Sequence, residues 1–294
     1  MERKRASVGA TTPGKECVVD GVRLVYDDEG SGPPLLCLHA IGHGARDFAD
    51  LRAALRARHR VLALDWPGQG NSADDHVPAS AARYAELLAG FVESLGIPEL
   101  VILGNSIGGA AAVRFGAARS RRVRGLVLVN PGGLDRVDRT ARLVTGAMAR
   151  FFRAGARGAW WYPTLFGLYY RVVLPEAPAR AQRERIVSSA FEIAPVLAQA
   201  WSSFGHPAAD TRELAMALRC PVFVAWAKND RIIQLRRNRP TIDRIPNVRF
   251  EEFPAGHAPF LECPDRFRVS LEAFLAEVWT PRGADRNSHL RASA

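Results

Sequence analysis

Short apolar runs, separated by stretches with a helical pattern, dominate this sequence. The runs are rich in Val, Leu and Ile and alternate little between polar and apolar positions, which is typical of parallel strands buried on both faces. They lie at residues 35–39, 61–65, 100–104, 123–130, 222–226 and 248–253. We therefore predict a central sheet built mainly from parallel strands.

Two further patterns complete the predicted fold. Residues 17–26 alternate polar and apolar positions around an Asp-Gly pair, which indicates an antiparallel hairpin. Between most of the apolar runs, apolar side chains recur at helical spacing, as at Tyr84, Leu87 and Phe91, and residues 267–278 keep the same spacing near the end. Strands that alternate with helices predict an α/β fold, with helices flanking a mostly parallel sheet.

One interval breaks this alternation. About 90 residues separate the apolar run that ends at Asn130 from the run that begins at Val222, far more than a crossover connection needs. We predict that most of this interval is an insertion made of helices. The predicted parts are flexible ends at 1–16 and 279–294, a core formed by 17–131 and 219–278, and the insertion at 132–218.

Composition and charge exclude several classes of protein. The 294 residues are 48% hydrophobic, which fits a globular chain and excludes a collagenous or wholly disordered one. There are 40 basic and 30 acidic side chains, for a net charge of +10, but the arginines are spread along the chain and no nucleic-acid motif occurs. Residues 6–16 lack the apolar segment of a secretory signal, and the apolar run at 158–170 is too short to span a bilayer. We therefore expect a cytoplasmic protein with no nucleic-acid partner and no stable membrane insertion.

The sequence Gly-Asn-Ser-Ile-Gly at 104–108 directly follows a predicted strand and precedes a helical pattern. A G-x-S-x-G sequence in this context forms a sharp strand-to-helix turn that exposes the serine at the carboxyl edge of the sheet. The helix N-terminus beneath it favours developing negative charge. Ser106 is therefore the candidate nucleophile.

A serine needs a base, and the base needs a carboxylate that orients it. His257 stands just beyond the final predicted strand, where a loop delivers it over the carboxyl edge of the sheet. Asp230 ends the preceding strand at the same edge, and the chain order serine, acid, histidine is the one that this arrangement shows in α/β proteins. Asp135, which follows the strand ending at Asn130, is the alternative acid.

Acyl transfer also needs hydrogen-bond donors where an oxyanion forms. The backbone N–H of Ile107, next to the nucleophile, is one candidate. The loop after the 35–39 strand supplies the second, with the amide of Ile41 best placed.

These motifs together resemble the α/β-hydrolase superfamily, over residues 17 to 278. The sequence Asp-Trp-Pro-Gly-Gln-Gly-Asn-Ser at 65–72 is similar to the family's D-x-P-G-x-G-x-S turn, and Gly256-His257 is similar to its catalytic histidine motif. Ala40 departs from the family pattern, which has His-Gly at this place in the oxyanion loop. The resemblance implies that the insertion at 132–218, after the sixth strand, is a cap over the site.

The resemblance implies a serine hydrolase that cleaves a small carboxylic ester or lactone through an acyl-enzyme, without cofactor or metal. Cleavage of a carbon-carbon bond next to a ketone is the alternative chemistry, and a non-catalytic ligand-binding protein is an alternative of another class. A serine at the elbow argues against epoxide hydrolases and haloalkane dehalogenases, which use aspartate there. We expect a small apolar acyl or ketone compound to contact Trp160, Trp161 and Phe260. The sequence does not predict an oligomeric state.

Overall fold

The computed structural model describes residues 14–280, and within them the mainly parallel sheet is confirmed. The eight strands are β1 (Lys15–Val19), β2 (Val22–Glu29), β3 (Pro34–Leu38), β4 (Arg60–Leu64), β5 (Leu100–Asn105), β6 (Val123–Val129), β7 (Val222–Ala227) and β8 (Val248–Phe253). They form one sheet in the order β1-β2-β4-β3-β5-β6-β7-β8. Only β2 runs antiparallel to its neighbours β1 and β4.

The predicted hairpin is confirmed as β1 and β2. Its two-residue turn places Asp20 at φ 49° and Gly21 at φ 76°, the left-handed geometry that matches the twist of paired strands. β1 begins at Lys15, two residues before the start of the core that we predicted. The rest of the predicted flexible N-terminus at 1–13, and the predicted tail from 281 onward, lie outside the described residues.

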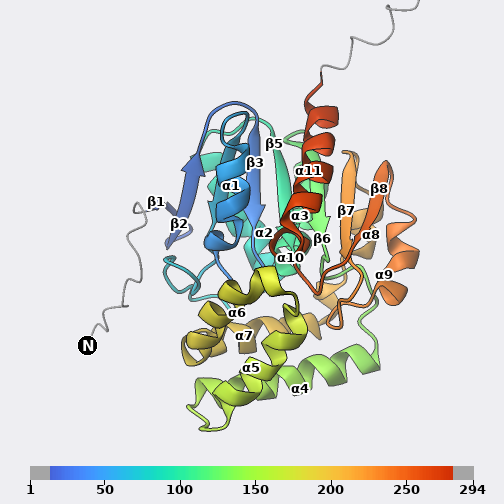
Figure 1. The fold of residues 1–294 in the computed structure, drawn as a ribbon. Coiled ribbons are helices and arrows are strands. Elements are labelled where there is room, and N and C mark those ends of the chain that lie inside the picture. Colours follow the sequence, from blue (N-terminus) through green and yellow to red (C-terminus); the bar gives the residue numbers. More distant parts are fainter. Residues whose placement is uncertain (1–13, 281–294) are drawn as a thin grey trace, which may run out of the picture.

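Helices cover both faces of the sheet (Figure 1), which explains why the central strands are apolar throughout. Every residue of β5 and of β7 is buried. The helices of the core are α1 (Ala49–Leu55), α2 (Ala81–Ser94), α3 (Ile107–Ala118), α8 (Arg212–Met216), α9 (Leu235–Ile242), α10 (Pro259–Glu262) and α11 (Pro264–Trp279), with a short 3-10 helix at Ala45–Phe48. In Figure 1, α1 and α11 lie in front of the sheet, whereas α2 and α3 pack together behind it.

The long interval between β6 and β7 is largely helical. It contains α8, which packs against α3 and so lies with the core although it falls within the insertion predicted at 132–218. The other helices of the interval are α4 (Arg139–Ala156), α5 (Tyr162–Val173), α6 (Arg180–Ser188) and α7 (Ala190–Phe204), with short 3-10 helices at Ala177–Ala179 and Pro207–Ala209. These four helices gather beyond the end of the sheet at which β3 terminates (Figure 1), and α4 packs along α7. The carboxyl ends of the parallel strands therefore face the inserted helices, and a site at this edge lies between the two.

Candidate active site

Ser106 occupies a strained turn between β5 and α3. Its φ of 54° and ψ of −116° lie in a region that residues with a side chain rarely adopt. Close packing of the flanking chain holds this turn, because a Cβ on Gly108 would lie 2.5 Å from the carbonyl oxygen of Leu38. A Cβ on Gly104 would lie 2.5 Å from the carbonyl oxygen of Gly108. Only glycine fits at these two positions, and the turn leaves Ser106 half-buried at the N-terminus of α3.

The structure pairs His257 with Asp230. The loops after β7 and β8 carry these residues, and His257 Nδ1 lies 2.7 Å from Asp230 Oδ2. Both side chains are nearly sealed from solvent, with exposed fractions of 5% and 1%. A carboxylate at this distance accepts a hydrogen bond from Nδ1–H and leaves Nε2 of the neutral ring as the free basic nitrogen.

Four donors fix the Asp230 carboxylate. Oδ1 accepts hydrogen bonds from the backbone amides of Ile232 and Ile233, at 2.7 Å and 3.0 Å. Oδ2 accepts one from the Asn130 side-chain amide at 2.5 Å, besides the His257 ring. Asn130 is itself held, because its Oδ1 accepts the amide of Ala227 at the end of β7. Asn130 is a contributor to the site that our sequence analysis did not identify.

The neighbouring carboxylate changes the proton affinity of His257. Burial acts to lower the pKa of the ring, but the charge of Asp230 and its hydrogen bond outweigh burial, so the pKa is raised above 6.5. A raised pKa makes the imidazole a stronger base than a free histidine.

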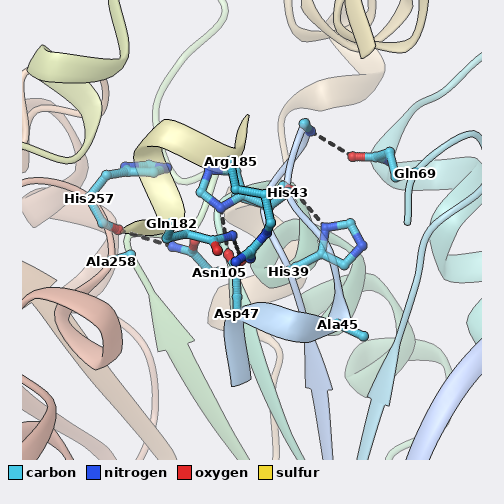
Figure 2. Close-up of polar contacts among 12 residues, drawn as sticks. His39, His43, Ala45, Asp47, Gln69, Asn105, Gln182, Arg185, His257 and Ala258 are labelled. Atoms are coloured by element: carbon cyan, nitrogen blue, oxygen red, sulfur yellow. Dashed lines mark hydrogen bonds and ion pairs between the residues drawn. The ribbon is translucent and has the colours of Figure 1, made fainter. Parts of the chain in front are cut away.

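The loop that carries His257 is fixed by two side chains that the sequence analysis missed. Glu262 Oε2 accepts hydrogen bonds from the amides of Gly256, His257 and Ala258, at 2.9, 2.9 and 3.0 Å. Asn105, the last residue of β5, donates from its side-chain amide to the His257 carbonyl at 3.1 Å (Figure 2). The sequence shows Glu262 five residues after His257 and Asn105 directly before Ser106. Neither spacing indicates which backbone group the side chain binds.

The loop between β3 and the 3-10 helix at Ala45–Phe48 lies beside the turn that carries Ser106. Gln69 Oε1 accepts the amide of Gly42 at 2.6 Å and so ties the loop to the turn after β4 (Figure 2). His39 is a structural residue, since Nδ1 bonds the Ala40 carbonyl and Nε2 accepts the amide of Trp66. Burial lowers the pKa of His39 to about 4. Among the described residues, no hydrogen bond occupies the amide of Ile41.

A cavity of about 1000 Å³ opens over Ser106 and His257. The inserted helices supply much of its apolar wall, and the loop after β3 contributes Ile41 and His43. The apolar and aromatic residues that α4, α5 and α7 contribute are Ala141, Val144, Met148, Tyr169, Tyr170, Val173, Trp201 and Phe204. A pocket of this size, mostly apolar with a few polar groups, is typical of small-molecule sites.

The three aromatic residues that we predicted to bind substrate do not line this cavity. Trp160 lies at the turn before α5 and is 88% exposed. Trp161 packs against Phe151, and Phe260 is buried in the core, where it stacks on Phe48. Trp160 and Trp161 precede α5, whereas Tyr169 and Tyr170, which line the cavity, lie near the other end of that helix.

Asp135 lies on the cavity wall but does not contact His257. Its carboxylate pairs with Arg237 of α9, whereas the His257 ring bonds Asp230. Across residues 14–280, no group of three or more His, Cys, Asp or Glu side chains is placed to bind a metal ion. The helices in the same range are all too short or too polar to cross a membrane.

Comparison with known sequences assigns most of the chain to one family. The sequence profile described as the alpha/beta hydrolase family matches residues 35–269. A protein of Azorhizobium caulinodans that carries the provisional name carbamate hydrolase RutD is 28% identical over 257 residues, which cover 87% of this chain and 96% of that protein. A 2-hydroxy-6-oxononadienedioate/2-hydroxy-6-oxononatrienedioate hydrolase of Paraburkholderia phymatum is 27% identical over 272 residues, covering 87% and 92%.

A solved structure shares the fold. A thermophilic esterase from Thermogutta terrifontis, determined with malate bound, superposes with a TM-score of 0.74 and 22% sequence identity. The match covers 92% of this chain and 99% of the esterase. The overall fold is therefore one already known in a hydrolase.

Proposed function

Since the chain belongs to the alpha/beta hydrolase family, we propose that it is a serine hydrolase that cleaves a small carboxylic ester or lactone through an acyl-enzyme intermediate. One observation carries the proposal: Ser106 on its strained turn and the paired His257 line the same cavity. These are the nucleophile and the base that acyl transfer needs.

The reaction follows from the positions of these groups. Ser106 Oγ attacks the substrate carbonyl carbon as its proton passes to Nε2 of His257, and the carbonyl oxygen becomes an oxyanion. When the tetrahedral intermediate collapses, the proton passes from His257 to the departing alcohol oxygen. Water then attacks the acyl-enzyme by the same route, with His257 as its base, and releases the acid.

Asp230 is the proposed orienting acid of this reaction. Its carboxylate holds the tautomer in which Nε2 is free, and it stabilises the imidazolium that forms when the serine proton is taken. The amides of Ile41 and Ile107 are the proposed oxyanion donors. Ile107 is the first residue of α3, where amides lack a helical partner, and Ile41 lines the cavity with its amide unoccupied.

The inserted helices between β6 and β7 are the proposed cap. They cover the carboxyl edge of the sheet and supply the apolar wall of the cavity, so they exclude water and select the acyl part of the substrate. The four cysteines, Cys17, Cys37, Cys220 and Cys263, are free, which supports a reducing compartment such as the cytoplasm.

A second candidate chemistry is hydrolysis of a carbon-carbon bond next to a ketone. The Paraburkholderia relative is named as a hydrolase of hydroxy-oxo-dienedioates, and its match spans nearly its whole length. The same serine, histidine and cavity can serve this reaction, so the substrates separate the two candidates. Purified protein is offered short p-nitrophenyl esters, lactones and vinylogous diketones side by side.

Replacement of Ser106 by alanine tests the proposal for any substrate that is turned over. Loss of a triad member lowers kcat by several orders of magnitude, to the level supported by binding and oxyanion contacts alone. Circular dichroism confirms that the variant is folded. Folded Ser106→Ala protein with undiminished ester, lactone and diketone hydrolysis would refute the proposal.

A further inference from the structure

A second histidine-carboxylate pair lies on the wall of the same cavity. His43 Nδ1 lies 2.5 Å from Asp47 Oδ2, and the two side chains are 1% and 0% exposed. The pair is distinct from that of Asp230, because it belongs to the loop after β3 and the 3-10 helix that follows (Figure 2). His43 lines the cavity together with Ser106 and His257.

Two side chains of α6 also contact the Asp47 carboxylate, at the oxygen that His43 does not bond. Gln182 donates its side-chain amide to Oδ1, and an Arg185 nitrogen lies 3.6 Å from the same oxygen. Figure 2 shows both side chains beside the carboxylate, on the side away from the β3 loop. The guanidinium compensates the buried negative charge, so Asp47 does not require a charged partner in His43. The Asp47 carboxylate can only accept, so Nδ1 of His43 is the donor in this contact.

The other nitrogen of the His43 ring is then free. In the neutral ring that donates from Nδ1, Nε2 carries a lone pair and accepts a hydrogen bond. No group among the described residues forms a hydrogen bond with Nε2. Some described side chains have a polar atom that is both unpaired and buried from solvent, but Nε2 of His43 is not one of these atoms. The Tyr170 ring packs against the imidazole with centroids 5.8 Å apart and fixes its plane. Nε2 is therefore an oriented acceptor with access to the cavity.

We propose that His43 Nε2 accepts a hydrogen bond from the substrate, and that the natural substrate is an acyl compound with a hydroxyl group close to the scissile carbonyl. The inference deepens the proposed function and rests on it. His43 lies two residues after Ile41, the proposed oxyanion donor, so its acceptor lies on the side of the cavity where the carbonyl oxygen would sit. The surrounding wall is largely apolar, so a simple alkyl acyl group leaves Nε2 without a partner, whereas a hydroxyl satisfies it.

Matched esters measure this preference directly. The probes are methyl 2-hydroxybutanoate and methyl 3-hydroxybutanoate, each compared with methyl butanoate in a pH-stat. Each ratio of kcat/KM is divided by the ratio of alkaline hydrolysis rates, which removes the inductive effect of the hydroxyl. We expect a corrected preference of about tenfold or more for at least one hydroxy ester, the size expected when a buried acceptor gains or loses its partner.

Two variants of His43 separate the acceptor from the contact with Asp47. His43→Asn keeps an amide that can donate to Asp47 but is too short to present an atom at the Nε2 position, so the corrected ratio falls to about one. His43→Gln reaches that position with an amide and retains part of the preference. His76→Asn is the matched control, because the His76 side chain is 74% exposed and does not line the cavity, and its ratio stays at the wild-type value.

The outcomes distinguish this inference from the proposed function. A corrected ratio of one for both hydroxy esters in the wild type overturns the inference, as does a preference that survives in His43→Asn or falls equally in His76→Asn. Ser106→Ala is measured with the same esters. If it abolishes turnover while the wild type shows no preference, the serine mechanism stands and only the role of His43 fails. If Ser106→Ala keeps full turnover, the proposed function itself fails.

Discussion

Glu262 holds the backbone of His257 in place: its Oε2 lies 2.9 Å from the His257 amide nitrogen. The same oxygen accepts the amides on either side, so a single buried carboxylate oxygen gathers three consecutive N–H groups of the loop. Burial raises the pKa of Glu262, and the backbone hydrogen bonds oppose that effect. Glu262 does not take part in the proposed reaction, but it positions the His257 imidazole relative to Ser106.

Loss of Glu262 should therefore reduce activity without removing any reacting group. We expect Glu262→Ala to lower kcat/KM by about 100-fold, because a displacement of the base by about 1 Å costs that much. Glu262→Gln keeps one acceptor oxygen and should lose less. Glu272→Gln on the surface of α11 is the control, and its steady-state kinetics should match the wild type. Wild-type kinetics in Glu262→Ala would show that the loop holds its shape without this carboxylate.

The two candidate acids can be separated by amide substitution. Asp230→Asn should lower kcat by about 10⁴-fold, because the amide can no longer hold the tautomer with a free Nε2. Asp135→Asn loses an ion pair with Arg237 that is partly exposed, and its kcat should stay within a few-fold of the wild type. Both are measured with the same ester under identical conditions. Near-native turnover by Asp230→Asn would exclude it as the orienting acid.

The pH dependence of kcat/KM should report the raised pKa of His257. The base works only when it is neutral, so activity falls as pH decreases through its pKa, and the midpoint of this acid limb should lie above 6.5. Removal of the Asp230 charge in Asp230→Asn should move the limb of the residual activity to lower pH. A wild-type midpoint below 6.5 would show that burial affects the pKa of His257 more strongly than the Asp230 carboxylate does.

Gly108, two residues after Ser106, should be intolerant of a side chain. In Gly108→Ala, the new methyl would lie 2.5 Å from the Leu38 carbonyl oxygen, so α3 must shift away from β3. We expect a loss of about 1–3 kcal/mol in the free energy of unfolding, together with reduced kcat as the elbow moves away from the Ile41 loop. Denaturant melts and kinetics measure both effects.

Gly146→Ala provides the matched control for this substitution. Gly146 lies within α4, and a Cβ there would meet no atom within 4 Å. Alanine should leave the stability unchanged or raise it, because glycine is the poorer helix former. Equal stability of Gly108→Ala and the wild type would show that the crossing of α3 and β3 is looser than the structure indicates.

The sheet and the elbow could be predicted because local sequence determines them. Buried strands such as β5 and β7 are continuous apolar runs, and the turn at Ser106 needs glycine at fixed offsets. The pairing of His257 with Asp230 followed from topology, since the carboxyl ends of neighbouring parallel strands meet at one edge.

The contacts across the site were not predictable in the same way. Asn130 bonds Asp230 and Ala227, about 100 residues further along the chain, and Glu262 bonds three amides of a loop whose shape the sequence does not reveal. Neither set of contacts leaves a periodic pattern. Trp160, predicted to contact substrate, instead lies exposed in the turn before α5, and no periodic pattern in the sequence marks that turn. Tyr170 of α5 lines the cavity, because α5 packs against α4 and α7 with that side toward the site.

Mapping the site of reaction with a fluorophosphonate tests the central claim most directly, because this probe modifies a serine only when a neighbouring base activates it. The protein is incubated with the probe, digested and examined by peptide mass spectrometry, with heat-denatured protein and Ser106→Ala as controls. We expect one adduct, on the peptide that contains Ser106, in the native wild type and none in either control. An unlabelled native protein, or an adduct on another serine, would show that Ser106 is not the activated nucleophile.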